Sequence, residues 1–141
     1  MADLKERILE IIGQPQLSGF ATVTEEGKPW VRYVMAVGRD DMEIRFASFV
    51  SARKVKQIAR EAEVHLTCGV TDPTKIAPYL QIQGRARFTT EEGERHGFWN
   101  DILEPIFSGP DDPNYGVVVV TPYRIEYWTL GKHEPEVWEA G

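Results

Sequence analysis

The sequence predicts a mainly β protein of the α+β class, in which six or seven short antiparallel strands close into a small barrel with flanking helices. Segments with alternating apolar and polar residues, typical of half-buried strands, recur through most of the chain and are separated by turn residues. Helical spacing of apolar residues is confined to three short segments. Closure into a barrel is favoured because it leaves no exposed strand edge.

Length and composition indicate a single domain over residues 1–141, with a helix at 1–13 and an acidic tail at 131–141. The chain is 42% hydrophobic and 27% charged, which is ordinary for a globular protein. Cys68 is the single cysteine, so a disulfide framework is excluded. No apolar run reaches the ~18 residues that cross a bilayer, and the first residues do not resemble a signal peptide. We therefore expect a cytoplasmic protein with no membrane partner.

The charge and histidine content argue against two further classes of partner. A formal net charge of -6 would repel nucleic acid overall, so a nucleic-acid-binding barrel is disfavoured. The three histidines, at positions 65, 96 and 133, and the one cysteine do not have the spacing of metal ligands. We expect no metal site.

The first half of the chain predicts a helix followed by a three-stranded meander. Residues 1–13 carry apolar side chains at helical spacing and are expected to pack on the sheet. Residues 20–24 and 30–37 alternate in polarity and are joined by a turn at 25–28, which indicates a hairpin. Residues 42–47 predict the third strand.

A second helix and two more strands follow. Ser51 is a favourable N-cap residue for a helix of about three turns. Residues 64–70 predict a strand that ends at a turn over 71–74. Residues 79–88 predict another, with one apolar and one polar face. Cys68 alternates with apolar residues and is expected to be a small buried hydrophobe, not a nucleophile.

The last third of the chain predicts a helix, a loop and a final pair of strands. Thr89 and Glu92 have the spacing of a capping box at a helix start. The proline-rich loop at 105–113 is either a cover over a cleft or a plain surface connection. Residues 117–127 predict strand structure with a break at Pro122.

The segment that begins the second helix has the residues of an anion site. The first amides of a helix lack internal partners and carry the positive end of the helix dipole, so an anion gains hydrogen bonds there. Arg53 and Lys54 oppose that dipole unless a phosphate offsets their charge. A solvated basic turn is the competing interpretation.

Three ordered segments resemble the motifs of the pyridoxamine 5'-phosphate oxidase-like flavoproteins, and most closely their general-stress-protein branch. The segments are Arg32 to Val37 (RYVMAV), Ser51 to Ile58 (SARKVKQI) and Arg124 to Trp128 (RIEYW). Each motif is weak alone, but their order and spacing agree with the family from about Leu17 to Trp128.

The resemblance implies a split β-barrel homodimer that holds FMN in each of two clefts between the subunits. By position, Ser51, Arg53 and Lys54 correspond to the residues that hold the FMN phosphate. Trp128 corresponds to a residue that reaches the flavin from the partner subunit, and Gln81, or Tyr79 two residues earlier, to a polar flavin contact. The resemblance also matches Arg32, Tyr33 and Val34 to the strand that borders the flavin ring. It matches Phe46, Ala47 and Ser48 to the strand that leads to the phosphate.

Two of these residues also have interpretations that need no ligand. An aromatic such as Trp128 in an apolar strand is more often part of the core. Arg32 shares a strand face with Trp30, and a cation over that ring would account for it without a cofactor.

The sequence departs from the family pattern after Trp128. Vitamin-processing oxidases place an Arg-x-His pair for the substrate phosphate there, whereas this chain has Thr129 to Pro135 without such a pair. Ala47 also lacks a hydroxyl that the family often offers to the flavin. The resemblance therefore does not extend to pyridoxamine phosphate as the substrate.

The leading functional hypothesis is an FMN-binding oxidoreductase that transfers hydride or electrons, with a small-molecule redox partner such as NADH or NADPH. No side chain is convincing as a general acid or base. The alternative is a non-catalytic binding or storage module of the same fold for flavin, deazaflavin or haem.

Overall fold

The computed structural model describes residues 2–70, 72–75 and 78–141. The helices are α1 (Leu4–Ile12), α2 (Arg53–Arg60), α3 (Glu92–Phe98) and the 3-10 helix η1 (Asp101–Leu103). The strands are β1 (Gln16–Val23), β2 (Pro29–Gly38), β3 (Ile44–Phe49), β4 (Glu63–Cys68), β5 (Tyr79–Thr89), β6 (Tyr115–Trp128) and β7 (Glu136–Glu139).

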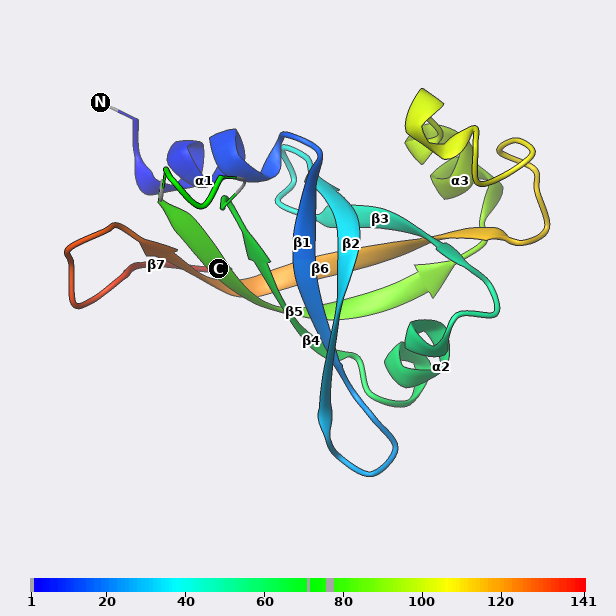
Figure 1. The fold of residues 1–141 in the computed structure, drawn as a ribbon, viewed down its shortest axis with the longest axis horizontal. Helices are drawn as coiled ribbons and strands as arrows, with labels where there is room; N and C mark the ends of the chain where they lie inside the picture. The colour runs from blue at the N-terminus through cyan, green and yellow to red at the C-terminus, as the bar shows by residue number, and fades with distance from the viewer. Residues whose placement is uncertain (1, 71, 76–77) are drawn as a thin grey trace.

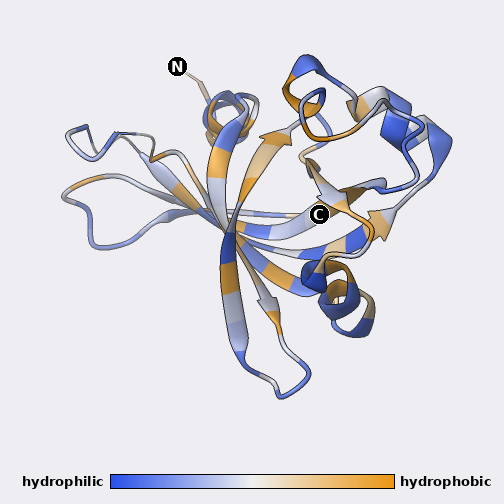
Figure 2. Ribbon diagram, turned by 45° about the vertical axis from the view of Figure 1, so that its right-hand side comes forward, coloured by the Kyte–Doolittle hydropathy of each residue, from blue (hydrophilic) through white to orange (hydrophobic). Residues whose placement is uncertain are grey.

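The strands form one antiparallel sheet in the order β3-β2-β1-β4-β5-β6-β7 (Figure 1). Because β3 also pairs with β6, the first six strands close into a barrel and β7 lies outside that closure. This confirms the predicted antiparallel barrel. Hydrophobic and hydrophilic residues alternate along the strands (Figure 2), as expected for strands with one face in a core.

The barrel core is closed at one end by α1. Ile8 and Ile12 of this helix are fully buried in the same cluster as Phe20 and Phe46 from the barrel. The side chain of Asp3 caps the helix by accepting a hydrogen bond from the backbone N–H of Glu6. The helix expected within residues 1–13 and its packing on the sheet are confirmed.

The predicted start of the second helix is wrong by one residue. Ala52 is the N-cap of α2, and no side chain caps the helix. Ser51 lies before it in an exposed turn, so its hydroxyl is not the cap. The helix spans only Arg53–Arg60, because the chain is extended from Glu61 toward β4.

The capping box predicted for the third helix is also absent. Glu91 is the N-cap of α3 and makes no side-chain cap. Thr89 is still part of β5, and its hydroxyl accepts from the backbone N–H of Glu91 at 3.0 Å. The helix ends at Phe98, and η1 then begins separately, capped by Asn100.

The break expected at Pro122 does not interrupt the strand. β6 runs through it without a gap, and the register shifts opposite Gln83 and Gly84. A proline is tolerated at such a bulge because its missing N–H leaves no ladder bond unmade. The expected tail at 131–141 contains β7, which pairs with β6.

The third strand begins later than predicted, at Ile44. Met42 has a φ of 72° and lies in the turn before the strand. The turn predicted over 71–74 includes residue 71, which lies outside the described residues.

Within the described part of the chain, no helix combines the length and apolar character needed to cross a membrane.

Candidate cofactor-binding site

The barrel is split between β2 and β3. These strands pair only at Val37 with Arg45 and at Gly38 with Ile44, after which β3 continues beside β6. Past that point neither strand has the other as a ladder partner, so alternate residues on the facing edges present backbone N–H and C=O groups to the gap. Unpaired backbone groups of this kind suit the polar edge of a ligand.

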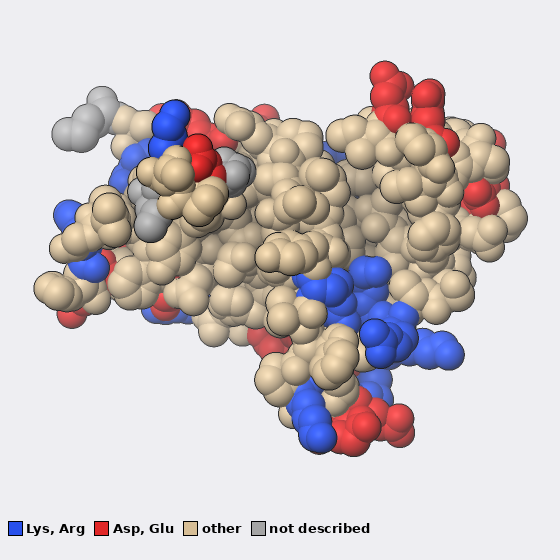
Figure 3. Space-filling view, viewed as in Figure 1, with Lys and Arg blue, Asp and Glu red and all other residues tan. Residues whose placement is uncertain are grey.

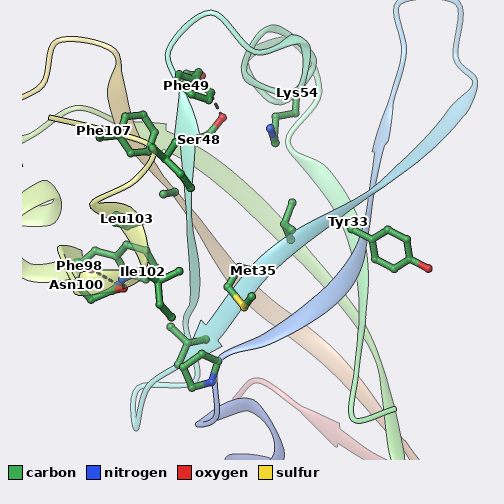
Figure 4. A pocket seen from close by; sticks show the side chains of 15 residues that line it. Tyr33, Met35, Ser48, Phe49, Lys54, Phe98, Asn100, Ile102, Leu103 and Phe107 are labelled. Carbon is green, nitrogen blue, oxygen red and sulfur yellow. Dashed lines mark hydrogen bonds between the residues drawn. The ribbon is translucent and has the colours of Figure 1, made fainter. Parts of the chain in front are cut away.

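A cavity of about 310 Å³ lies at this split (Figure 4). Its volume falls within the range of small-molecule sites. One wall comes from β2 and β3, and the other from α3, η1 and the loop after them. The lining residues are Pro15, Tyr33, Val34, Met35, Val37, Ala47, Ser48, Phe49, Lys54, Phe98, Asn100, Ile102, Leu103, Ile106 and Phe107.

The proline-rich loop supplies part of the second wall. Phe107 is buried and packs its ring 4.8 Å from that of Phe49 and 5.0 Å from that of Tyr115. Tyr115 in turn donates its hydroxyl to the carbonyl of Arg95 at 2.9 Å, and burial raises its pKa to about 12. The loop is therefore a packed cover over the cavity and not a plain surface connection.

An ion pair fixes α3 to the barrel. Arg45 of β3 is 5% exposed and donates to Glu94 of α3 through Nε at 3.0 Å and Nη2 at 3.2 Å. The hydrogen bond from Arg45 is the main cause that holds the pKa of Glu94 below its usual range. This bidentate contact holds the helical wall of the cavity in place.

The opposite end of the cavity is cationic. Lys54 is half-buried there, and its pKa is lowered first by burial and then by Arg32. The pKa of Arg32 is lowered by burial and by Arg53. Among the described residues, no salt bridge within 4.0 Å includes any of these three cations. Figure 3 shows basic side chains gathered over the part of the surface that α2 occupies.

Arg32 also ties α2 to the barrel. Its Nη1 donates to Thr22 Oγ1 at 2.8 Å and its Nη2 to Gln57 Oε1 at 2.9 Å. Its guanidinium lies 5.9 Å from the centroid of Phe20. The cation expected over Trp30 is supplied by Arg53 instead, at 5.7 Å.

Five of the residues expected to bind a cofactor line the cavity: Tyr33, Val34, Ala47, Ser48 and Lys54. The Tyr33 side chain points outward from β2, away from the other labelled residues (Figure 4). Ser51 is exposed in the turn before α2, on the approach to Lys54. Phe46 faces the core, with its ring 4.8 Å from that of Phe20, so its side chain does not reach the cavity.

Gln81 and Trp128 are not brought to the cavity within one chain. Gln81 pairs with Glu126, and Trp128 pairs with Tyr79 at the end of β6 and donates its indole N–H to Glu126. The other end of this strand is at Tyr115, beside the cavity cover. A strand of this length extends on the order of 40 Å.

Sequence reasoning missed most of the helical wall of the cavity. Ile102 and Leu103 have helical spacing with Phe98, which is also the pattern of an ordinary core helix. The Asn100 side chain makes its hydrogen bonds with nearby backbone groups. Its Oδ1 accepts from the N–H of Ile102, and its Nδ2 donates to the carbonyl of Phe98. Nothing in this pattern distinguishes a cavity wall from a core contact.

The arrangement suits a flat apolar group with an anionic end. The wall that faces Lys54 across the cavity consists mainly of apolar side chains, and the lining includes no histidine, cysteine or carboxylate. The cavity therefore offers an apolar surface and charge complementarity to a ligand.

Comparison with known proteins agrees with this fold. General stress protein 26 of Bacillus subtilis (strain 168) is 26% identical over 133 residues, which cover 94% of each chain. The crystal structure of general stress protein 26 from Bacillus anthracis superposes with a TM-score of 0.83 at 26% identity, over 97% of this chain and 98% of that one.

Two more distant crystal structures share the fold. One is a pyridoxamine 5'-phosphate oxidase-related, FMN-binding protein from Nostoc punctiforme, with a TM-score of 0.62 and 16% identity over 86% of this chain and 78% of that one. The other is a haem-binding protein from Mycobacterium smegmatis, with a TM-score of 0.76 and 15% identity over 99% of this chain and 59% of that one.

The match to the family extends through every element that forms the cavity. The sequence model of the pyridoxamine 5'-phosphate oxidase family matches residues 4–129, from the first helix to the end of β6. This chain therefore belongs to the pyridoxamine 5'-phosphate oxidase family.

Proposed function

We propose that this chain binds FMN in the cavity at the split of the barrel and acts as an oxidoreductase. The observation that carries the proposal is the group of three cations, Arg32, Arg53 and Lys54, beside an apolar cavity. Among the described residues, none of the three has a carboxylate partner within 4.0 Å. A phosphate dianion would compensate these charges, and the apolar walls fit a flavin ring. The FMN-binding relative from Nostoc punctiforme adds support.

Each part of the site has a physical task in this proposal. Bound FMN would supply hydride or electron transfer. Lys54 and Arg53 hold the phosphate through charge-assisted hydrogen bonds, and Arg32 keeps α2 seated so that both are in place. The free backbone groups of β2 and β3 face the polar edge of the ring. Phe107 and its loop keep water from the apolar side.

The proposal includes a homodimer, because one sheet face is apolar and uncovered. Leu17, Val31 and Tyr33 are 62%, 68% and 79% exposed on neighbouring positions of β1 and β2. Exposed apolar patches of this kind mark interaction surfaces. The same face continues across β4 and β5 to Gln81 and Trp128. Two copies packed through this face would bury the apolar side chains and place Trp128 of one near the cavity of the other.

The test of the cofactor is direct. Titration of the protein with FMN and with riboflavin should show tight binding of FMN and much weaker binding of riboflavin, because riboflavin lacks the phosphate. Lys54→Ala and Arg53→Ala should each cost about 1.5–3 kcal/mol of FMN binding free energy, or roughly 10- to 150-fold in Kd. Lys28→Ala, which removes a cation from the β1–β2 turn away from the cavity, is the control. Equal Kd values for all four proteins would contradict the proposal.

A non-catalytic binding module is the second candidate, and the absence of histidine, cysteine and carboxylate from the lining favours it. Anaerobic reduction of the FMN-loaded protein by NADH or NADPH separates the two. An oxidoreductase should be reduced faster than free FMN, whereas a storage module should not. Deazaflavin and haem are competing ligands, and the same titration with each of them ranks the three.

A further inference from the structure

A second hollow lies beside the phosphate-binding end of the cavity and shares none of its lining residues. We call it the hairpin groove. It has a volume of about 440 Å³ and lies between the turn that joins β1 to β2 and one face of α2. Its lining residues are Thr24, Glu25, Glu26, Trp30, Arg53, Lys56, Gln57 and Arg60.

The helical side of the hairpin groove is basic. Arg53, Lys56 and Arg60 are spaced three and four residues apart, which places them on one face of α2. The Arg60 side chain already makes hydrogen bonds within the protein, because its Nη2 donates to the carbonyls of Val23 and Thr24. Arg53 and Lys56 take part in no salt bridge among the described residues, although the protein as a whole has a net charge of -6.

The opposite side is aromatic and fixed. Trp30 is 45% exposed, and the Arg53 guanidinium lies 5.7 Å from its ring centroid. Two hydrogen bonds close the turn beside it: the N–H of Thr24 donates to the carbonyl of Lys28 at 2.8 Å, and the N–H of Lys28 donates to Thr24 Oγ1 at 3.0 Å. The groove is therefore formed before any ligand enters.

We propose that the hairpin groove binds a nucleoside 5'-phosphate group, with the base stacked on Trp30 and the phosphate on Lys56. Exposed aromatic rings stack with bases, and cations of this kind bind phosphate. Glu25 and Glu26 also line the groove, and carboxylates can accept hydrogen bonds from ribose hydroxyls, as in other nucleotide sites. A bare phosphate would leave Trp30 and both carboxylates unused.

Arg53 connects the hairpin groove to the flavin site, because it lines the groove and precedes Lys54 of the cavity. The nucleoside phosphate can thus belong to a free mononucleotide or to one half of a dinucleotide whose other half extends toward the cavity. The site does not depend on the proposed FMN binding.

The experiment uses AMP as the probe, with calorimetry on the protein with and without FMN. AMP should bind both forms and leave the flavin absorption unchanged, and adenosine and inorganic phosphate should each bind at least tenfold more weakly. Lys56→Gln and Trp30→Leu should each weaken AMP about tenfold. Lys28→Gln removes a charge from the same turn but outside the groove, and it should change the Kd of AMP by less than about twofold.

The outcomes separate the two proposals and the sources of the nucleotide. Failure of FMN to bind while AMP still depends on Lys56 would overturn only the flavin proposal. Displacement of FMN by AMP, or equal AMP affinity in Lys56→Gln and Lys28→Gln, would overturn this one. If NADPH displaces AMP from the groove while FMN stays bound, the natural ligand is a nicotinamide dinucleotide. If FAD displaces both AMP and FMN, the natural ligand is a flavin dinucleotide. If neither dinucleotide displaces AMP, it is a mononucleotide.

Discussion

Arg32 illustrates how one residue serves both the fold and the proposed site. Its guanidinium bonds to Thr22 on β1 and to Gln57 on α2, so it joins the barrel to the helix that carries Lys54. Arg53, by contrast, is exposed, and among the described residues its side chain makes no hydrogen bond. Its guanidinium lies over the Trp30 ring. The two arginines are equally visible in the sequence, and their different surroundings distinguish them.

This difference predicts a split between stability and binding. Arg32→Ala should lower the free energy of unfolding by about 1.5–3 kcal/mol, because it removes charge-assisted hydrogen bonds and leaves buried Thr22 with fewer partners. Arg53→Ala should change it by less than about 0.5 kcal/mol. Both should weaken FMN binding. Urea unfolding of the two variants measures the difference, and equal stability losses would count against a structural role for Arg32.

At the scale of elements, Glu94 of α3 pairs with two arginines of the barrel, Arg45 at 3.0 Å and Arg87 at 3.7 Å. The pKa of Glu94 in the folded protein lies below its ordinary value of 4.5, chiefly because Arg45 donates to its carboxylate. A carboxyl group of this kind stabilises the folded state above the unfolded pKa. The stabilisation is lost as the pH falls through the lower, folded pKa.

The expected result is a larger loss of stability below about pH 4.5 in the wild-type protein than in Glu94→Gln. At neutral pH, Glu94→Gln should itself cost roughly 1.5–3 kcal/mol, because it leaves buried Arg45 without its main partner. Thermal unfolding of both proteins from pH 3 to 7 tests this. Parallel curves for the two proteins would show that Glu94 is not the group that titrates.

The seating of α1 on the sheet depends on Gly38. A Cβ added there would lie 2.5 Å from Ile12 Cδ1 and 2.6 Å from its Cγ1. Gly38→Ala should therefore destabilise the protein by about 1–3 kcal/mol through overpacking. Gly97→Ala in α3, where an added Cβ meets nothing within 4 Å, should be neutral or stabilising. Chemical denaturation compares the two variants. A denaturation midpoint for Gly38→Ala equal to that of the wild-type protein would refute the close approach of Ile12 to residue 38.

At the scale of the whole molecule, the proposed role of Trp128 at the cofactor depends on the proposed homodimer. Trp128 lies at the far end of β6 from the residues that pack on the cavity cover. It belongs, however, to the sheet face that carries the exposed apolar residues of β1 and β2. If FMN binding involves Trp128, assembly and binding must be linked.

Sedimentation should show two chains per particle. Leu17→Asp places a charge on the apolar face and should weaken dimerisation at least about tenfold, with a parallel loss of FMN affinity. Val137→Asp changes an exposed apolar residue of β7 and should leave both unaffected. A monomeric wild-type protein that still binds FMN tightly would contradict the shared site.

Local pattern was sufficient for most elements. Alternation in the strands and helical spacing in α1 depend on nearest neighbours along the chain, so the antiparallel barrel and the buried Cys68 are predictable. Burial raises the pKa of that thiol to about 11, as expected for a small hydrophobe. The errors at Thr89 and Pro122 arose where strand pairing overrode a local preference, whereas Ser51 lies in the turn before α2.

By itself, the sequence determined the strands, the helices and the cationic start of α2, because each depends on residues close together in the chain. Only the tertiary structure decided that β3 leaves β2 for β6 and that Phe107 closes the resulting gap. It also decided that Arg32, and not Ser51, supports the helix with Lys54. Those outcomes depend on pairings between residues far apart in the chain, whose free energies no local pattern contains.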